Sequence, residues 1–447
     1  MSKEIILHNI KDWSRVDERE SFWGNVDLLL PNLNFGIHRY NNALWTSGQV
    51  GVGRLFDRNG MPVQDNGKDH VLSVAPSYNL NPWEMLETVI LDDEYDAYIA
   101  ELEKEQKYLF HIFYDQPVIR LPHGYGAEAE TLFALSYITS CYSLCKKGLM
   151  KSLIHCEENF TGKLRGRIDV SRNIKLNSAK GRCDRFFCKY IGFTEDSVEN
   201  RIIKAALQKC KMIIKRRFQE DNSIKKKTAY CLNALRHVKD TTIKNSDFSM
   251  ADAGGLYSYY IPVLQQAKAI LSFKFQAYEE RNLHYNAKPV YTIPYIINME
   301  TLFEYYARTV LKQALSGMEY KVEKYSKRLF LQKGVIVPES AEKGIHLMPF
   351  CIPDIIITKD DCPVLVIDVK YKMAGKPDRS DSHQLLAYVL LTGADRCAFI
   401  LPGEKTGVRE METTGCSYLN LNASNVRYYE LLLGEKCDSA AIRSILA

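Results

Sequence analysis

The stretch that decides the fold of the last third of the chain is FCIPDIIITKDDCPVLVIDVKY, which occupies residues 350–371. Its first part, 350–358, is rich in β-branched residues, which favour strands. Residues 359–363 are typical of a turn, and 364–371 again has the composition of a strand. The pattern therefore predicts a β-hairpin.

Three charged residues interrupt this apolar hairpin. Side chains two apart on a strand share a face, so Asp368 and Lys370 should project together, and the antiparallel partner can bring Asp354 beside them. Two adjacent carboxylates repel each other, and a bound Mg²⁺ would relieve that repulsion while keeping positions for a phosphate oxygen and water. Lys370 can orient or help to deprotonate the attacking water and offset charge on the phosphate.

The alternative is a structural one, because an Asp followed two residues later by Lys is common on exposed strands. Burying such charges without a metal or a partner costs roughly several kcal/mol. A structural explanation would therefore need Asp368 and Lys370 to lie at an exposed edge. The apolar context favours the metal-dependent nuclease site.

A helix is predicted at 380–392, with Ser380 or Asp381 near its N-cap. Gln384 and Tyr388 are four residues apart on it and therefore share a face. We expect this face to place an amide and a phenol over the carboxylates, as contacts to DNA or to a metal-bound water.

A second helix is predicted at 297–315, with Glu300 and Glu304 one turn apart. Either glutamate is a candidate for a further acidic metal ligand, with Glu304 the stronger of the two. The simpler interpretation is that both are solvated carboxylates on the helix surface.

Length and composition limit the class of protein. The chain has 447 residues, 46% of them hydrophobic and 25% charged, which is enough for two or three domains with ordinary cores. The formal net charge of +5 is small, so nucleic-acid binding should depend on local patches. No stretch approaches the ~18 apolar residues of a membrane span. We therefore expect a cytoplasmic protein.

The expected architecture is an α+β N-terminal region followed by an α/β nuclease domain. A strand-rich, partner-binding region is expected at 1–100, a mixed and mainly helical region at 101–274, and the nuclease domain at 275–447. The other predicted elements are helices at 131–146, 198–218, 257–272 and 439–447, strands at 397–403 and 426–433, and a linker near 281–288.

The middle of the chain carries two basic segments. Lys163, Arg165 and Arg167 alternate, so on a strand they would form one basic face, for phosphate, for an NTPase partner or simply for solvent. The end of the helix at 198–218 is also strongly basic. Its simpler interpretation is a solvated run of charge, since the helix dipole also favours basic residues at a helix C-terminus, and the alternative is contact with phosphate.

Two kinds of site are not expected. The 12 cysteines are scattered and lack the paired spacing of a zinc site, so they are expected to be reduced thiols. Gly51 and Gly53 belong to no complete glycine-rich nucleotide loop and fit bulges or hairpin ends better, and residues 403–406 lack the upstream glycine of a P-loop. Any nucleotide hydrolysis must therefore come from another chain.

These residues resemble a known family. The hairpin and the helix after it look like the PD-(D/E)xK (restriction-endonuclease-like) nuclease superfamily, and specifically like the McrC family, the nuclease subunits of McrBC modification-dependent restriction systems. Residues 162–170 and 194–207 are similar to the middle region of McrC-type proteins. The resemblance covers roughly residues 70–405 and is loose in the first part of the chain.

The resemblance implies a function and roles for the residues. Asp354, Asp368 and Lys370 take the catalytic positions, with Gln384 and Tyr388 supporting them. It implies an endonuclease of an anti-phage restriction system that uses Mg²⁺, with Mn²⁺ as the alternative. The partner implied is an AAA+ NTPase of the McrB type, using GTP or, alternatively, ATP. The substrate would be modified or foreign double-stranded DNA, and the chain would also stimulate hydrolysis by the partner.

Two other functions stay open at this point. One is a stand-alone repair or recombination nuclease of the same superfamily, which would cut DNA without nucleotide. The other is a scaffold that activates an NTPase ring without cutting DNA. The intact motif disfavours the scaffold, and the long N-terminal region without a catalytic motif disfavours the stand-alone nuclease.

Overall fold

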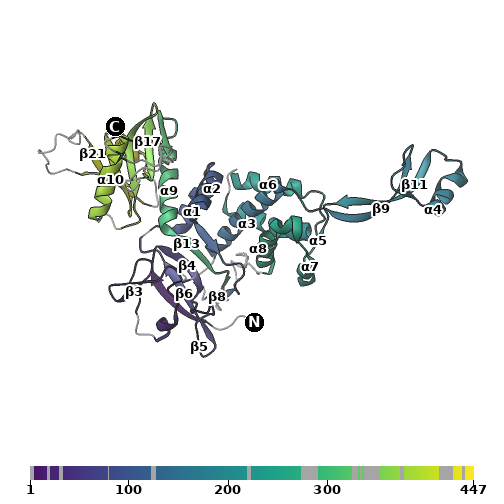
Figure 1. Ribbon diagram of the computed structural model, residues 1–447, viewed down its shortest axis with the longest axis horizontal. Helices are drawn as coiled ribbons and strands as arrows, with labels where there is room; N and C mark the ends of the chain where they lie inside the picture. The colour runs from purple at the N-terminus through teal and green to yellow at the C-terminus, as the bar shows by residue number, and fades with distance from the viewer. Residues whose placement is uncertain are drawn as a thin grey trace. The chain divides into compact units, whose positions relative to one another are not determined.

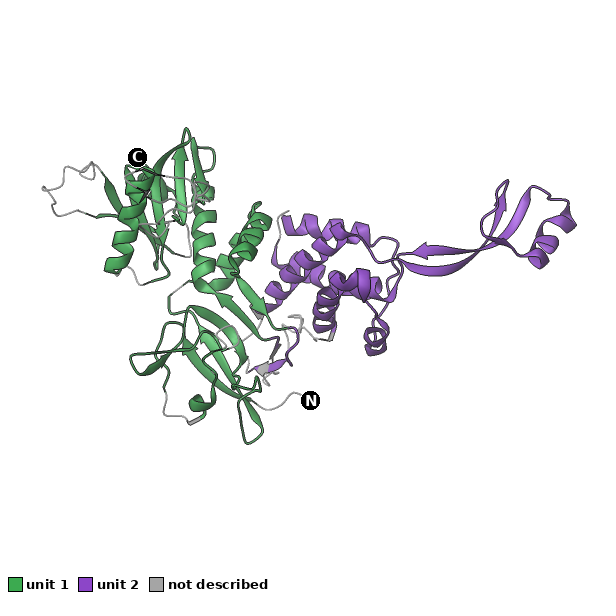
Figure 2. Cartoon of the chain, viewed as in Figure 1, with its two compact units in different colours: residues 1–113, 294–447 green, residues 114–293 purple. Residues whose placement is uncertain are grey.

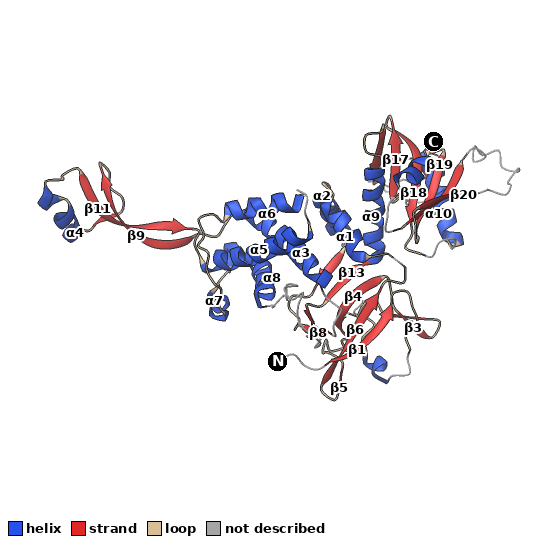
Figure 3. Ribbon diagram, turned by 180° about the vertical axis from the view of Figure 1, so that it is seen from behind, coloured by secondary structure: helices blue, strands red, loops and turns tan. Residues whose placement is uncertain are grey.

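The computed structural model describes residues 5–17, 21–29, 34–78, 80–121, 127–218, 223–272, 290–324, 331–332, 335–336, 352–372, 377–411, 426–434 and 438–446, in a mixed α/β architecture (Figures 1 and 3). By their contacts the residues form two compact units (Figure 2). Unit 1 comprises Met1–Phe113 and Pro294–Ala447, and unit 2 comprises Tyr114–Ile293. The three regions predicted from the sequence stay a prediction, and the predicted linker at 281–288 lies outside the described residues.

The N-terminal sheet of unit 1 draws its strands from both parts of that unit. Its order is β1-β6-β4-β13-β7, with β5 paired to β6, and only the β1–β6 pair is parallel among these described pairings. The elements are β1 (Ile5–Lys11), β4 (Gln49–Arg54), β5 (Gln64–Asp65), β6 (Lys68–Ala75), β7 (Phe110–Ile112) and β13 (Tyr295–Asn298), with the hairpin β2 (His38–Tyr40) and β3 (Ala43–Trp45), the 3₁₀ turn η1 (Ser21–Asn25), and helices α1 (Pro82–Leu91) and α2 (Tyr95–Glu105).

The pairing of β4 with β13 depends on a glycine. Gly51 and Gly53 lie inside β4, so the sequence-based placement in bulges or at hairpin ends is wrong. A Cβ atom at Gly51, whose φ is +151°, would lie 2.1 Å from the carbonyl oxygen of Tyr295 on β13. Glycine therefore allows the close approach of β13. This strand matters for the site because helix α9 (Met299–Ala314) begins directly after it.

The second sheet of unit 1 has the order β14-β17-β18-β19-β21-β20. Strands β18, β19 and β21 are parallel to one another, and the pairs β14–β17, β17–β18 and β21–β20 are antiparallel. The elements are β14 (Tyr320–Glu323), β17 (Ile355–Lys359), β18 (Cys362–Val369), β19 (Arg396–Pro402), β20 (Gly407–Met411), β21 (Arg427–Leu433), α10 (Arg379–Thr392) and α11 (Ser439–Ser444), with a small pair β15 (Leu331–Gln332) and β16 (Val335–Ile336) beside them in the sequence.

Helix α10 packs on β18 and β19 through one apolar cluster. Val366 and Phe399 of the strands meet Leu385 and Val389 of the helix there. The cluster forms because alternate strand residues face the helix, while apolar helix residues recur every three to four positions. The catalytic candidates therefore lie at the edge of a well-packed core.

The structure confirms the predicted hairpin as β17 and β18. They pair antiparallel across a two-residue turn whose residues Asp360 and Asp361 both have positive φ, as tight hairpin turns require. The predicted helix is α10, although its N-cap is Asp378 and not Ser380 or Asp381. The later strands, the helix at 297–315 and the terminal helix are confirmed as β19, β21, α9 and α11.

Unit 2 is a helical bundle from which a two-stranded arm extends (Figure 2). The arm strands β9 and β11 pair antiparallel over their whole length; β9 is largely exposed, and most residues of β11 are partly or fully buried. The elements are β8 (Ile119–Leu121), α3 (Ala127–Lys147), β9 (Ser152–Thr161), β10 (Arg167–Ile168), α4 (Val170–Leu176), η2 (Ser178–Lys180), β11 (Arg185–Thr194), α5 (Val198–Arg217), α6 (Ser223–Ala234), α7 (Asn245–Met250), η3 (Gly255–Tyr260), α8 (Ile261–Ser272) and β12 (Val290–Thr292). No described helix of the chain is long and apolar enough to cross a lipid bilayer.

One further expectation for the middle of the chain needs correction. Of the alternating basic residues, only Arg167 lies in a strand, while Lys163 and Arg165 lie in the loop before β10. These residues therefore do not form one basic strand face.

We expect Gly51→Ala to destabilise unit 1 by roughly 2–4 kcal/mol, because the new methyl group would push β13 away from β4. Urea unfolding followed by tryptophan fluorescence measures this change. Gly407→Ala is the matched control, since Gly407 also lies in a strand but a Cβ there meets nothing within 4 Å. Equal stability of the two variants would show that the β4–β13 approach is not tight.

Candidate active site

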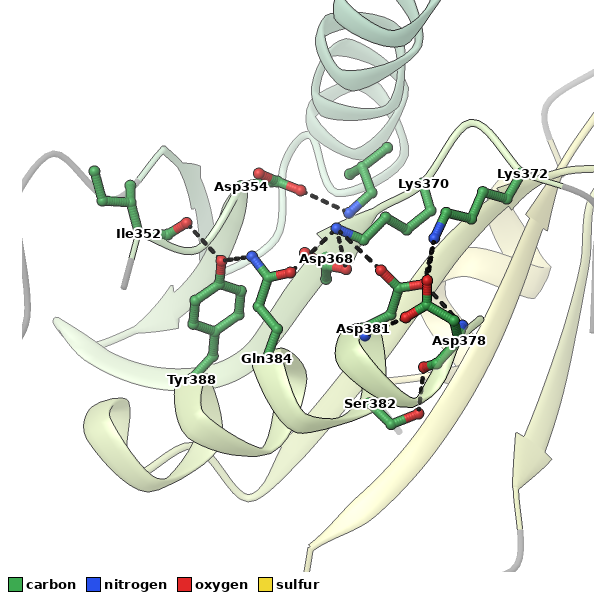
Figure 4. Close-up of polar contacts among 11 residues, drawn as sticks. Ile352, Asp354, Asp368, Lys370, Lys372, Asp378, Asp381, Ser382, Gln384 and Tyr388 are labelled. Carbon is green, nitrogen blue, oxygen red and sulfur yellow. Dashed lines mark hydrogen bonds and ion pairs between the residues drawn. The ribbon is translucent and has the colours of Figure 1, made fainter. Parts of the chain in front are cut away.

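The antiparallel register of the hairpin brings Asp354 and Asp368 together. Ile355 pairs with Ile367 and Ile356 with Val366, so Asp354 lies opposite Asp368 at the open end of the hairpin. Oδ2 of Asp354 accepts a hydrogen bond of 2.8 Å from the backbone N–H of Val369 (Figure 4). This bond fixes Asp354 against β18 just before β17 begins.

Asp368 is the most deeply buried charged group of the site. It is 0% exposed, its Oδ2 lies 3.1 Å from Nζ of Lys370, and its Oδ1 has no hydrogen-bond partner among the described residues. A buried carboxylate oxygen without a partner is costly and rare in stable proteins. The free oxygen of this carboxylate is therefore available to bind a cation.

Lys370 lies just beyond the end of β18, but its backbone continues the hydrogen bonding of β18 to β19. Its backbone N–H donates to the carbonyl oxygen of Ile400 at 2.9 Å, and its side chain projects to the same side as Asp368. Nζ of Lys370 also lies 3.3 Å from Oε1 of Gln384 and 3.7 Å from Oδ1 of Asp381 (Figure 4). The lysine is thus held by the hairpin and by α10.

Gln384 and Tyr388 form a chain of hydrogen bonds that begins at Lys370. The amide of Gln384 accepts from Lys370 and donates to the hydroxyl of Tyr388, which donates at 2.9 Å to the carbonyl oxygen of Ile352 (Figure 4). Gln384 is exposed, whereas Tyr388 is buried in the apolar cluster under α10. Tyr388 therefore anchors the segment that leads to Asp354, and Gln384 is the member that faces solvent.

The sequence analysis missed a second acid–base pair at the site. Asp381 is buried, and its Oδ2 lies 2.6 Å from Nζ of Lys372, which also contacts Asp378 at 3.2 Å. The sequence pattern predicts Asp381 only near the helix N-cap, and it does form a capping box with Asp378. Lys372 continues the alternation of Asp368 and Lys370, and this spacing was a signal that the sequence offered.

Glu304 lies near the aspartates, and its side chain is 19% exposed. Its Oε1 is 3.4 Å from Nζ of Lys324, which also contacts Glu101 and Glu105 of α2. Burial, and then the charge of Asp354, raise the pKa of Glu304 to about 7. Glu300 is exposed in the first turn of α9, close to Gly48.

Burial and neighbouring charges control the protonation of the two aspartates. Burial, followed by the charge of Asp368, raises the pKa of Asp354 to about 6. Burial also raises the pKa of Asp368 to about 6, although the charge of Lys370 opposes the shift. For Lys370, burial is the largest single effect and lowers the pKa, but the charge and hydrogen bond of Asp368, together with the charges of Asp354 and Asp381, make the net shift upward. The lysine is therefore a cation at neutral pH.

The donor set of the site fits a divalent cation with oxygen ligands. Within the described ranges, no three or more His, Cys, Asp or Glu side chains are already grouped to hold a metal ion. The partnerless oxygen of Asp368 and the raised pKa values of both aspartates nevertheless show an excess of negative charge that a cation would neutralise. Two carboxylates and a neighbouring ammonium group can together bind a phosphate through a cation and hold a water beside it.

Comparisons with known proteins add two solved structures. No curated protein matches the chain in sequence. The refined half-complex from the tetradecameric assembly of Thermococcus gammatolerans McrB AAA+ hexamers with bound McrC is 13% identical, covers 99% of each chain and has a TM-score of 0.41. The cryo-EM structure of the Thermococcus gammatolerans McrBC complex is 14% identical, covers 70% of this chain and 88% of that chain and has a TM-score of 0.30.

A family model for the McrBC 5-methylcytosine restriction system component matches residues 125–402. The matched region contains the bundle and arm of unit 2, helix α9, the hairpin and helix α10. It therefore includes Asp354, Asp368 and Lys370. Because the match spans more than half of the 447 residues, the chain belongs to the family of McrBC 5-methylcytosine restriction system components.

Proposed function

We propose that this chain is the DNA-cutting subunit of an McrBC-type restriction system, an endodeoxyribonuclease of the PD-(D/E)xK type. The observation that carries the proposal is the buried Asp368, which lies opposite Asp354 and 3.1 Å from the ammonium group of Lys370. The chain's membership of a restriction-system family supports DNA as the substrate. Modified or foreign double-stranded DNA in the cytoplasm is the expected target.

The cofactor proposed for the site is Mg²⁺, with Mn²⁺ as the alternative. Asp354 and Asp368 would hold it, with Glu304 as the candidate third ligand. The cation supplies Lewis-acid stabilisation of the phosphate and lowers the pKa of a water that it binds.

Three side chains of the protein would support the reaction beside the cation. Lys370, a cation with a raised pKa, offsets the charge that develops on the phosphate and orients the attacking water. Gln384 holds Lys370 from the solvent side and is placed to contact the DNA backbone. Tyr388 holds Gln384 and the segment before Asp354 in place, because its hydroxyl accepts a hydrogen bond from Gln384 and donates one to the carbonyl oxygen of Ile352. A raised pKa makes Lys370 a better charge stabiliser than general base.

We further propose that cutting requires an AAA+ NTPase of the McrB type, using GTP or, alternatively, ATP, whose hydrolysis this chain stimulates. Family membership is the support, because the family consists of components of a multi-subunit system. In the solved Thermococcus gammatolerans assembly, McrC is bound to McrB AAA+ hexamers. The sequence of the present chain contains no P-loop, which is consistent with a separate nucleotide-hydrolysing subunit.

The decisive variant is Asp368→Asn, which keeps the shape of the side chain but removes the charge. We expect it to lower cleavage of a cytosine-methylated plasmid at least about 100-fold in the presence of Mg²⁺, the NTPase partner and nucleotide, because the metal site loses its buried ligand. Asp361→Asn is the matched control, since Asp361 lies at the exposed turn of the same hairpin. We expect this control to cut within about twofold of wild type.

Each other outcome of this assay has a distinct meaning. Equal cutting by Asp368→Asn and wild type would remove Asp368 from the metal site. Cutting by the isolated chain without nucleotide would identify a stand-alone nuclease. Stimulation of the partner's NTPase activity without cutting under any condition would identify a scaffold.

The aspartates also predict a pH dependence of stability for the metal-free protein. Their pKa values rise from 3.8 to about 6 on folding, so the folded state binds more protons between these values. Their stabilising contribution is therefore present below about pH 4 and is lost as the pH rises through about 6. Relative to wild type, we expect Asp368→Asn to gain about 1–2 kcal/mol between pH 4 and pH 7.5.

Urea unfolding in EDTA at several pH values measures this gain. Added Mg²⁺ should stabilise wild type at pH 7.5, lose its effect below about pH 6 where protons compete for the carboxylates, and leave Asp368→Asn unchanged. A constant difference between the two proteins across this range would contradict the assignment of a strained, buried charge at residue 368.

A further inference from the structure

A row of alternating charges begins at Asp368 and ends in solvent (Figure 4). Nζ of Lys370 lies 3.1 Å from Oδ2 of Asp368 and 3.7 Å from Oδ1 of Asp381. Nζ of Lys372 lies 2.6 Å from Oδ2 of Asp381 and 3.2 Å from Oδ2 of Asp378. The side chain of Asp368 is fully buried, that of Lys370 is 20% exposed and that of Lys372 is 38% exposed. The row therefore leads from the candidate metal ligands out to the surface.

The two lysines of this row come from one segment of the chain. Side chains two residues apart on an extended segment project to the same side, and both lysines contact the one carboxylate of Asp381. Two residues of extended backbone span about 6–7 Å. Successive phosphates of one DNA strand are about 3.4 Å apart along the helix axis. Lys370 and Lys372 are therefore spaced to contact different phosphates of the same strand.

The simplest explanation of Lys372 is structural, in which it only neutralises the two acids that cap α10. The capping box is complete without the lysine, however. The N–H of Asp378 donates to Oδ2 of Asp381, and the N–H of Asp381 donates to Oδ1 of Asp378, both at 2.9 Å. A partly exposed ion pair contributes little to stability, and the helix dipole opposes a cation close to a helix N-terminus. Stability therefore does not account for a lysine at this position.

Lys372 can bind a phosphate oxygen without losing its anchor. The side chain of Asp381 is only 9% exposed, whereas that of Asp378 is 62% exposed. A phosphate that arrives from solvent can replace Asp378 as the outer partner of the ammonium group, while Asp381 holds the inner side. Burial lowers the pKa of Lys372, but the hydrogen bonds and charges of Asp381 and Asp378 make the net shift upward. The group is therefore a cation, and an ammonium group binds phosphate as a point charge.

We propose that Lys372 binds a second phosphate of the DNA strand, next to the phosphate that lies at Asp368 and Lys370. The contact fixes the position of the strand on the site and carries no sequence information, as is usual for contacts to the DNA backbone. Asp381 holds the lysine in place for this contact. That the bound strand is also the strand that is cut rests on the nuclease function proposed above.

The first test measures DNA binding by the full-length chain in EDTA, where no cation is available for cutting. Fluorescence anisotropy of a labelled DNA duplex gives the binding constant at several KCl concentrations. We expect Lys372→Gln to reduce the slope of log K against log [KCl] by about 1, because one phosphate contact fewer releases counterions. Lys372→Arg keeps the charge and should keep the wild-type slope. An unchanged slope in Lys372→Gln, or no binding of DNA by the wild-type chain, would overturn the proposal.

Lys359→Gln is the matched control for this measurement. Lys359 lies in β17 at the turn end of the same hairpin, its side chain is 41% exposed, and its Nζ lies 3.0 Å from Oε2 of Glu319. The control therefore removes one partly exposed, ion-paired lysine, as Lys372→Gln does, but at the opposite end of the hairpin. It should keep the wild-type slope. An equal reduction in both variants would show a general effect of charge and would count against a specific contact at Lys372.

Asp378→Asn separates phosphate binding from a purely structural ion pair. Asparagine caps a helix as well as aspartate does, so α10 should keep its start. We expect the affinity for DNA to rise about threefold, because the carboxylate that competes with the phosphate for Lys372 is gone. Asp361→Asn, at the exposed turn of the hairpin, removes the same charge far from the row and should change the affinity less. An affinity of Asp378→Asn at or below that of wild type would contradict the exchange of partners at Lys372.

The second test uses cleavage by the full chain with its NTPase partner, Mg²⁺ and nucleotide. We expect Lys372→Gln to raise KM for DNA about fivefold with kcat within about twofold of wild type, because the contact is made equally before and during the reaction. A lower kcat with KM unchanged would place Lys372 in the chemical step and overturn the proposal. Absence of cutting by wild type would contradict the proposed nuclease function instead, and the salt dependence of binding would still decide the phosphate contact.

Discussion

The buried charge of Asp368 constrains the arrangement around it. Its carboxylate lies within a sheet where neighbouring positions are apolar, and the ammonium group of Lys370, 3.1 Å away, offsets its charge. The lysine must therefore stay near, which requires Gln384 and Asp381 on α10 and a fixed backbone at the end of β18. The packing of α10 on β18 and β19 supplies that fixed frame.

Much of this frame could be predicted from local sequence. Two β-branched stretches around a turn predict the hairpin. An apolar helical pattern predicts α10, and it ends at Gly393, which has the positive φ of a helix C-cap. Asp354, Asp368 and Lys370 stand out because they are charges within apolar strands. The structure brings these three residues together with Gln384 and Tyr388, as their spacing predicts, while their catalytic roles stay a proposal.

The parts that the sequence did not predict depend on contacts between distant segments. Lys324 joins Glu304 to Glu101 and Glu105, although nothing in the spacing of these residues links them. The sequence pattern likewise places Gly51 in a bulge or at a hairpin end, because only the neighbouring strand β13 shows why a side chain is excluded there. Patterns of period 2 or 3.6 describe single elements and carry no information about which elements meet.

The course of the chain through the N-terminal sheet has a consequence for the architecture of the family. Strands β7 and β13 are paired neighbours, and the N–H of Phe113 donates to the carbonyl oxygen of Pro294 at 2.9 Å. Unit 2, residues 114–293, is therefore an insertion between two paired, neighbouring strands of this sheet. Such an insert can be lengthened, shortened or exchanged while the host sheet keeps every strand pair, so the bundle and arm can diversify independently of the candidate active site.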